Sequence, residues 1–387
     1  MQRDCYIIRA GHNRLPVTIL CLVLCSPLNG WAVEIEASRI DTGSWSLTLR
    51  AAGELNNQGE YQKARERYVW LLAKADSGRG FELPAQVRSY ILGQIADTDI
   101  SLGHYAEAED KVRQALALVS RREPSQMATY AVTAGVLADV RRIQGDYEDA
   151  IAVAQEAVAL GRKSLSSSSV QYGILVTKLA QVNLDRGDLG RATKLCKEAV
   201  SIFARSGSSA QIQLGTAYSN LAVAYDLAKK PTQALDNVRL AIAVWARILP
   251  FPHPNLVYVL STQADAYREL KHFAQAEMAA QEMLRLADSY FAPNHPERIA
   301  MLNHAAGVYL AENHYREAEP LLRQAAEIAK QIFPTGHPAL AATLTNYSYV
   351  LTKLKRKADA SRAQAEANSL LVFAGTRSEH RSLPDRR

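Results

Sequence analysis

The 387-residue sequence contains few residues that break helices or cross-link a chain: 14 Pro, 20 Gly and 4 Cys. Three of the cysteines, Cys5, Cys21 and Cys25, lie near the N-terminus, and only Cys196 lies beyond residue 32. A single thiol cannot form an intramolecular disulfide, so the fold beyond residue 32 must be stable through packing alone. With 48% hydrophobic residues, the chain can bury a sizeable core, and its composition favours helix over strand.

The sequence also lacks the short motifs of common active sites. It contains no glycine-rich phosphate loop, no His-Glu-x-x-His, no Cys-x-x-Cys and no Gly-x-Ser-x-Gly. We therefore predict that the protein is not an enzyme and needs no cofactor. The net charge of +6 is mild, and its Lys and Arg are interleaved with Asp and Glu, so we predict no nucleic-acid partner.

The first 32 residues resemble a secretion signal. They begin with positive charges at Arg3, Arg9 and Arg14. The apolar stretch at 15–25 is too short to span a bilayer, and small residues at Gly30 and Ala32 suit a signal peptidase. We predict a Sec-type signal peptide at 1–32, cleaved after Ala32, and a periplasmic or secreted protein. The alternative is an uncleaved segment that anchors the protein in the membrane, facing the periplasm.

A short pattern recurs along the rest of the chain: a turn residue, often Tyr two positions later, and Ala five positions later. The turn residues are Gly59, Gly103, Gly145, Gly187, Lys229, Lys271, Asn313 and Lys355. The first two lie 44 residues apart, and every later interval is 42 residues. The Ala column consists of Ala64, Ala108, Ala150, Ala192, Ala234, Ala276, Ala318 and Ala360. A constant period of this length is the signature of a repeat architecture.

A second column of small residues lies seven positions before each turn residue. It consists of Ala52, Ala96, Ala138, Ala180, Ala222, Ala264, Ala306 and Ser348. Apolar residues around the turns recur at steps of three and four, as in 214–227, which indicates helices. Small residues in both columns allow two helices to approach to about 8–10 Å. We predict an all-α solenoid of eight antiparallel helix pairs at 40–373, followed by a disordered basic tail at 374–387.

This pattern resembles the tetratricopeptide repeat family. Gly145-Asp146-Tyr147 matches the family's turn, and an aromatic residue precedes the turn by four positions at Tyr225, Tyr267 and Tyr309. The 42-residue period is similar to the kinesin-light-chain variant, whose longer helices begin at His-Pro. Such pairs occur here at 253–254, 295–296 and 337–338, but not in the first five repeats. The resemblance implies a right-handed superhelix that binds a protein or peptide in its concave groove.

Polar residues lie on the face of the first helices that the resemblance assigns to this groove. They are Asp97, Asp139, Arg142, Lys178, Gln181, Asp185, Asn220, Asp226, Asp265, Arg268, His304 and Asn346. We expect these side chains to bind a peptide or helix of a partner through hydrogen bonds and charge pairs. The predicted function is therefore a non-catalytic interaction scaffold. A regulatory subunit of an enzyme complex and a membrane-anchored adaptor are the alternatives.

Two further groups of residues receive a structural interpretation. His253, His295 and His337 cannot converge on one metal ion, because equivalent residues of neighbouring repeats lie about 10 Å or more apart. We expect each of them to begin a helix, with Pro in the first turn. Cys196 lies in a column that sister repeats fill with Val or Ala, so we expect a buried packing residue. The sequence predicts no metal site.

Overall fold

The computed structural model describes residues 43–78, 81–249, 252–332 and 338–377. Over these ranges it contains sixteen α-helices, one 3-10 helix, η1 (Gly207–Ala210), and no strand, which confirms the predicted helical solenoid. None of the described helices is long and apolar enough to cross a bilayer. The predicted signal peptide at 1–32 lies outside the described residues. The last helix continues to Arg377, so the predicted disordered tail at 374–387 begins within a helix, and its remainder also lies outside these ranges.

The helices form eight consecutive antiparallel pairs. The first helices are α1 (Gly43–Asn57), α3 (Ala85–Ser101), α5 (Met127–Ile143), α7 (Val170–Arg186), α9 (Gln211–Leu227), α11 (Asn255–Glu269), α13 (Glu297–Ala311) and α15 (Pro338–Lys353). The second helices are α2 (Tyr61–Asp76), α4 (Tyr105–Ala117), α6 (Tyr147–Ser164), α8 (Leu189–Arg205), α10 (Pro231–Trp245), α12 (Phe273–Tyr290), α14 (Tyr315–Ile332) and α16 (Lys357–Arg377).

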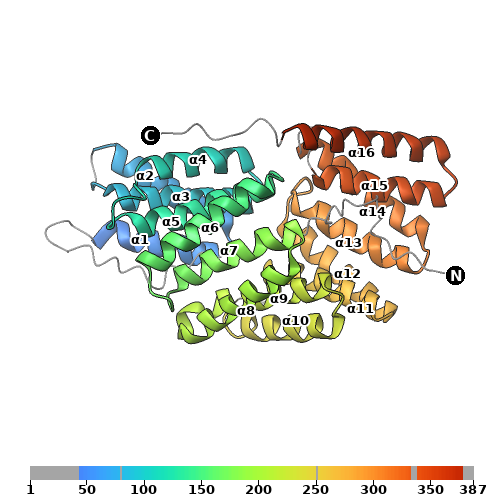
Figure 1. Cartoon of the computed structure of the whole chain (residues 1–387), viewed down its shortest axis with the longest axis horizontal. Coiled ribbons are helices and arrows are strands. Elements are labelled where there is room, and N and C mark those ends of the chain that lie inside the picture. The colour runs from blue at the N-terminus through green and yellow to red at the C-terminus, as the bar shows by residue number, and fades with distance from the viewer. Residues whose placement is uncertain (1–42, 79–80, 250–251, 333–337, 378–387) are drawn as a thin grey trace.

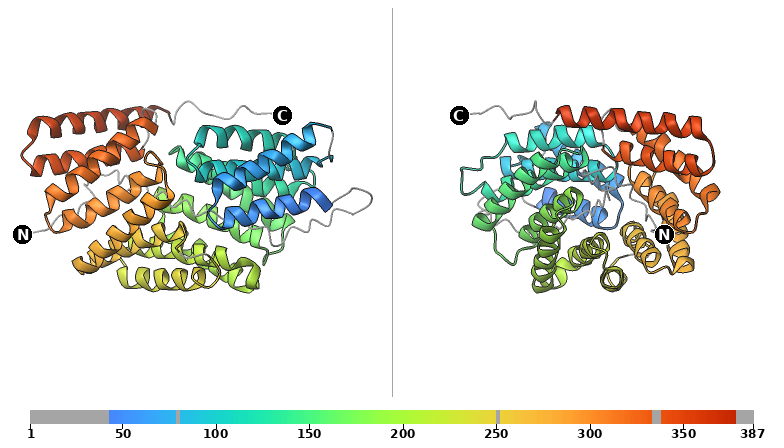
Figure 2. Two further views of the ribbon diagram at one scale, coloured as in Figure 1. Left: turned by 180° about the vertical axis from the view of Figure 1, so that it is seen from behind. Right: turned by 45° about the vertical axis from the view of Figure 1, so that its right-hand side comes forward.

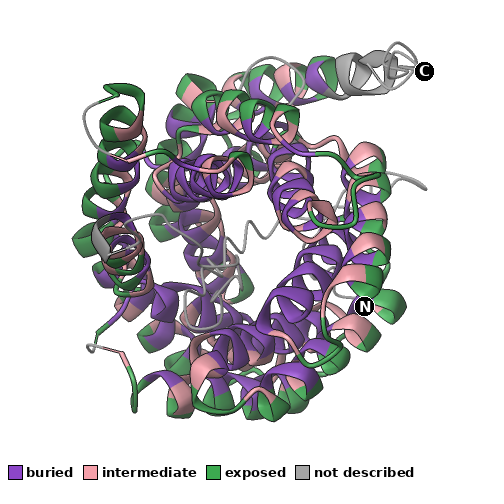
Figure 3. Ribbon diagram, turned by 90° about the vertical axis from the view of Figure 1, so that its left-hand side faces the viewer, coloured by how far each residue is buried: buried purple, intermediate pink, exposed green. Residues whose placement is uncertain are grey.

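The pairs wind into a superhelix (Figures 1 and 2). Each second helix packs on its own first helix and on the first helix of the next repeat, and from α3 onward each first helix also contacts the next first helix. The first helices therefore form an inner layer. Seen end-on, the helix pairs are arranged in a ring, with exposed residues concentrated on its outer side (Figure 3).

All eight turn residues adopt the left-handed backbone conformation. The φ angles are 79° to 86° at Gly59, Gly103, Gly145 and Gly187, and 60° to 63° at Lys229, Lys271, Asn313 and Lys355. Glycine adopts this conformation at little cost, whereas a side chain makes it unfavourable. Three lysines nevertheless adopt it here.

The two columns of small residues lie where the helices of each pair meet. All sixteen of these residues are buried, and fourteen of them are fully inaccessible to solvent. A larger side chain in either column would force the two helices apart, because overpacking a core costs about 1–3 kcal/mol. The columns thus explain why the same hairpin recurs eight times.

The superhelix closes on itself after five repeats. Nε2 of His253, before α11, lies 3.1 Å from the carbonyl oxygen of Asn57 at the end of α1. Nε2 of His295, before α13, lies 2.9 Å from the carbonyl oxygen of Ser101 at the end of α3. We call these two contacts the closing contact. His337, the third histidine of this series, lies outside the described residues.

Each histidine of the closing contact uses both ring nitrogens. Nδ1 of His253 accepts a hydrogen bond from the backbone N–H of Asn255 at 3.2 Å, and Nδ1 of His295 accepts one from Glu297, also at 3.2 Å. Since Nδ1 is an acceptor, the proton is on Nε2, which donates to the carbonyl of the earlier repeat. The geometry therefore requires neutral imidazoles. It also confirms that these histidines lie at helix starts.

The prolines of the same pairs pack against the turn glycines five repeats earlier. A Cβ atom on Gly59 would lie 2.7 Å from Cγ of Pro254, and one on Gly103 would lie 2.6 Å from Cδ of Pro296. Both distances are too short for carbon atoms. The closing contact therefore requires glycine at these two turns.

Candidate functional site on the inner helix face

Nine of the twelve sequence-predicted polar residues form two clusters of buried or partly buried charges. We call Asp97, Asp139, Arg142, Lys178 and Asp185 the first ion cluster, which spans α3, α5 and α7. We call Asp226, Asp265, Arg268 and His304 the second ion cluster, which spans α9, α11 and α13. Lone buried charges are costly, and both clusters reduce this cost by pairing charges across neighbouring repeats.

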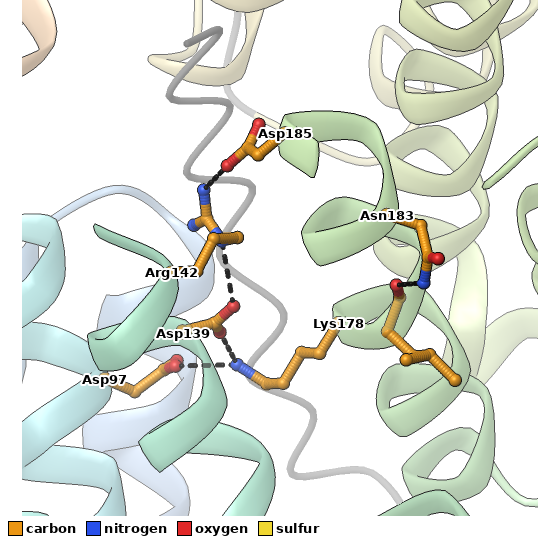
Figure 4. Close-up of polar contacts among 7 residues, drawn as sticks. Asp97, Asp139, Arg142, Lys178, Asn183 and Asp185 are labelled. Atoms are coloured by element: carbon orange, nitrogen blue, oxygen red, sulfur yellow. Dashed lines mark hydrogen bonds and ion pairs between the residues drawn. The ribbon is translucent and has the colours of Figure 1, made fainter. Parts of the chain in front are cut away.

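In the first ion cluster, two cations bridge three helices (Figure 4). Nζ of Lys178 lies 3.3 Å from a carboxylate oxygen of Asp97 and also bonds to Asp139. Nη1 of Arg142 donates to Asp185 at 2.9 Å, and its Nε lies 3.5 Å from Asp139. All five residues are buried. Burial raises the pKa of Asp185 to about 6, and the nearby Asp139 adds to this effect, although Arg142 opposes it.

In the second ion cluster, Asp265 is the central acceptor. It accepts a hydrogen bond from Nη2 of Arg268 at 2.8 Å and another from Nδ1 of His304. Burial tends to raise the pKa of Asp265, but His304 and Arg268 outweigh it and lower this pKa. Burial tends to lower the pKa of His304, but Asp265 raises it overall. Burial and the charge of Asp265 together raise the pKa of Asp226 to about 7.

The two clusters share one layout, three repeats apart. Asp265, Arg268 and His304 occupy the positions that Asp139, Arg142 and Lys178 occupy three 42-residue repeats earlier. In both copies the Asp pairs with the residue three positions later and with a residue of the next repeat. The copies differ at that last position, where Lys178 of the first cluster is replaced by His304 in the second.

The remaining predicted site residues lie on first helices of the repeats but outside the ion clusters. Gln181 is buried on α7, and Asn346 donates a hydrogen bond to Asn303 at 3.1 Å. Asn220 on α9 is fully buried, and neither its amide nitrogen nor its amide oxygen has a hydrogen-bond partner in the described part of the chain. Buried amides almost always have such partners, so Asn220 is an exception.

One polar residue of this region was missed by the sequence analysis. Glu297, the first residue of α13, is fully buried, and neither carboxylate oxygen has a hydrogen-bond partner among the described residues. Burial raises the pKa of Glu297 well above its usual value, although Arg142 opposes this effect. Its position beside His295 and Pro296 could have drawn attention to it only if the closing contact had been foreseen.

The residues that received a structural interpretation behave as packing residues. Cys196 is buried in a small apolar cluster with Ala180 and Leu221. Burial raises the pKa of the Cys196 thiol to about 12, so the reactive thiolate is disfavoured at neutral pH. Over the described ranges, no three His, Cys, Asp or Glu residues are grouped so that they could hold a metal ion.

Two family models of the tetratricopeptide repeat match the chain, at residues 214–255 and 256–331. The matched residues extend from α9 to α14, and their turn residues and Ala columns continue with the same period through the other repeats. The chain is a tetratricopeptide-repeat protein. No curated protein matches its sequence.

Solved structures with tetratricopeptide-like repeats are similar to this protein at low sequence identity. One is a kinesin light chain repeat protein of Podospora anserina, with 23% identity over 54% of this chain and 98% of that chain, at a TM-score of 0.40. Another is a Rap protein in complex with competence and sporulation factor, with 12% identity over 84% and 99% of the two chains, at a TM-score of 0.48.

A third similar structure is a signal transduction ATPase of Pyrococcus horikoshii with a tetratricopeptide repeat sensor. It is 14% identical over 87% of this chain and 49% of that chain, at a TM-score of 0.51. At this identity the similarity concerns the fold alone.

Proposed function

We propose that this tetratricopeptide-repeat protein is a non-catalytic interaction scaffold, and that its inner helix face binds a segment of a partner protein. The observation that carries the proposal is Asn220, a fully buried amide on that face with no partner for either atom among the described residues. Leaving such atoms unpaired costs about 1–3 kcal/mol each. A bound segment that supplied a donor and an acceptor would recover this free energy.

An amide is well suited to hold a polypeptide whose sequence varies. It can donate to a backbone carbonyl and accept from a backbone N–H at the same time. Asn220 occupies the position that Lys178 occupies one repeat earlier and His304 two repeats later. Lys178 and His304 are held in the ion clusters, so we expect these clusters to keep the inner face rigid. We assign to Asn220 the hydrogen bonds with the partner's backbone.

The test is affinity capture from native envelope extract with residues 33–387 as bait. We expect a protein that is captured by the parent and lost with Asn220→Leu, which removes the amide at similar size. The matched control is Asn237→Leu on α10, the second helix of the same repeat, which should retain the partner. Circular dichroism would show that both variants are folded. Equal capture by both variants, or no capture by the parent, would contradict the proposal.

We further propose that the protein acts in the periplasm or outside the cell. The support is the sequence pattern of residues 1–32, with its positive start, short apolar stretch and small residues before position 33. Mass spectrometry of the protein purified from its native host should give a mature chain that begins at Val33. Recovery of the full-length chain in the membrane fraction would instead support an anchored adaptor.

A further inference from the structure

The closing contact brings Glu297 to the first ion cluster. His295 bonds to Ser101, and Pro296 packs on Gly103, so the next residue, Glu297, is fixed beside the end of α3. The charge of Glu297 acts on Arg142 of α5, and the charge of Asp185 acts on Glu297. A residue of the seventh repeat is thereby placed among residues of the third and fourth repeats.

The carboxylate of Glu297 has hydrogen-bonding capacity that the described residues do not use. Both oxygens are buried and without a partner, and the nearby hydroxyl of Tyr105 has none either. A carboxylate can accept about four hydrogen bonds. An internal salt bridge would be expected to satisfy it, yet Arg142 donates to Asp185 and Asp139 instead.

The first ion cluster, beside which Glu297 lies, contains more acidic than basic groups. The first ion cluster contributes Asp97, Asp139 and Asp185 against Arg142 and Lys178. The cluster and Glu297 together hold four carboxyl groups and two cations, and Asp185 and Arg142 are the members that act on Glu297. This arrangement favours a ligand that carries a positive charge and disfavours an anionic one.

We propose that closure of the superhelix completes a binding site for a cationic side chain of the partner segment, between Glu297 and Asp185. The site deepens the proposed function and rests on it. Its ligand class is a guanidinium group, since a planar fork of N–H donors can engage both oxygens of Glu297 at once. The site exists only in the closed superhelix, because Glu297 and Asp185 come from repeats on successive turns.

Binding of a cation at this site should release a proton. Burial raises the pKa of Glu297 well above its usual value. Binding of a cation must therefore shift the carboxyl group to its deprotonated form, and the proton is lost to solvent. Affinity should therefore increase as pH rises. The other charged or titratable groups around Glu297 are Arg142, Asp185, Tyr61, Tyr105, His295 and Arg298. Arg142 opposes the raised pKa, and Asp185 reinforces it.

The probe is a fluorescein-labelled nine-residue peptide of Gly and Ser with one central Arg, measured by fluorescence polarisation with the full chain. The matched probe carries citrulline, which has the shape of Arg without its charge. We expect the Arg peptide to bind about 30-fold more tightly or better, as expected for a buried charge pair. Equal binding of the two peptides, or binding of neither at millimolar concentration, would overturn the proposal.

Three variants test whether the preference for the Arg peptide arises at the site between Glu297 and Asp185. Glu297→Gln should abolish both the preference for Arg and its increase with pH, and it should not unfold the protein, because it removes a buried acid. Gly103→Ala should weaken Arg binding by straining the closing contact, whereas Gly187→Ala, whose new Cβ meets nothing within 4 Å, should not. An Arg preference that persists in Glu297→Gln would place the cation elsewhere and refute the site.

This experiment can fail separately from the test of the scaffold. If Asn220→Leu abolishes capture of the partner but Glu297→Gln leaves Arg binding unchanged, the inner face binds a segment and the cationic site is wrong. If neither variant changes its respective binding, both proposals fail.

Discussion

The turns of the first two repeats and those of the last four have the same backbone conformation but different residues. Gly59 and Gly103 each face a proline of a repeat on the next turn of the superhelix, with no room for a side chain. Lys229, Lys271, Asn313 and Lys355 have φ angles of 60° to 63° and retain full side chains. The left-handed conformation alone therefore does not require glycine here. The closing contact does, at the turns where it occurs.

Gly187 has the left-handed backbone conformation without the lack of room for a side chain. It has a φ angle of 86°, yet a Cβ atom there would meet nothing within 4 Å. Substitution at Gly187 therefore measures the backbone cost by itself. Substitution at Gly59 or Gly103 measures the same cost together with the loss of the closing contact.

The ion clusters show a parallel difference between the two halves of the protein. The equivalent position holds Lys178 in the first cluster and His304 in the second, where Asp265 raises the pKa of the imidazole. The shared layout means that one position has been filled in two ways. The second half should therefore gain stability from protonation of His304, which the first half lacks at this position.

The largest expected effect is acid weakening of the closing contact. Burial lowers the pKa of His253 and His295 from 6.5 to about 4. A lowered histidine pKa gives stability that is present above about pH 6.5 and is lost as pH falls towards 4, up to about 3 kcal/mol for each histidine. Urea unfolding between pH 7 and pH 4 would measure it. A His253→Gln/His295→Gln variant, whose amides still donate but do not titrate, should lose less stability over this range.

This comparison must be made against the parent protein, because the buried carboxyl groups whose pKa values are raised act in the opposite direction. The pKa values of Asp185 and Asp226 are raised to about 6 and about 7, so protonating these groups in acid stabilises the folded state. They are present in both proteins, and their effect cancels in the difference. An identical pH dependence in parent and variant would contradict the assigned role of the histidines.

The next largest effect should come from breaking the first ion cluster. Lys178→Met leaves Asp97 and Asp139 without their shared cation and should cost about 3–5 kcal/mol in unfolding free energy. Chemical denaturation at several pH values provides the measurement.

The corresponding change in the second cluster should depend on pH. Asp265 raises the pKa of His304, so the stability that His304 provides is present at low pH and is lost as pH rises through this pKa. His304→Met should therefore cost more at pH 6 than at pH 9. A constant loss with His304→Met would contradict the assignment of this pH dependence to His304.

A smaller effect is expected at the glycine turns. Gly187→Ala should cost about 1–2 kcal/mol from the left-handed backbone alone. Gly103→Ala should cost about 1–3 kcal/mol more, because its Cβ would overlap Pro296. Thermal unfolding of the two variants provides the comparison, and equal losses would show that the closing contact does not constrain Gly103.

The smallest effect should appear at a lysine turn. Lys271→Gly relieves the backbone strain at φ 62° without disturbing the closing contact, so it should be neutral or stabilise the protein by up to about 1 kcal/mol. A clear destabilisation would mean that the Lys271 side chain makes an essential contact. Chemical denaturation resolves a difference of this size when parent and variant are measured side by side.

The sequence was sufficient to predict the helix pairs, because their determinants are local. The Ala columns and the turn residues specify each hairpin within a few residues, and the polar positions of the inner face follow from the helical period. The closing contact was not predicted, because it depends on the pitch of the superhelix. The pitch results from the small rotation and rise between neighbouring repeats, which add up over five repeats. A signal for it was nevertheless present: His-Pro pairs begin only in the sixth repeat, five repeats after glycine turns.

The ion clusters were predicted in part for the same reason. The acidic column with Asp97, Asp139 and Asp265 was visible from the period, but its pairing with Lys178 and His304 depends on how neighbouring repeats are offset. Glu297 was missed altogether, since its importance comes from a contact between residues nearly 200 positions apart.

The central claim is that the superhelix is closed between the second and seventh repeats. The most direct test is a double electron–electron resonance measurement on residues 33–387 with spin labels at the exposed positions Glu107→Cys on α4 and Arg316→Cys on α14. Cys196 is buried and should remain unlabelled. We predict a single narrow distance distribution, retained in Gly187→Ala and broadened to longer distances in Gly103→Ala. A broad distribution in the parent protein, unchanged by Gly103→Ala, would contradict closure.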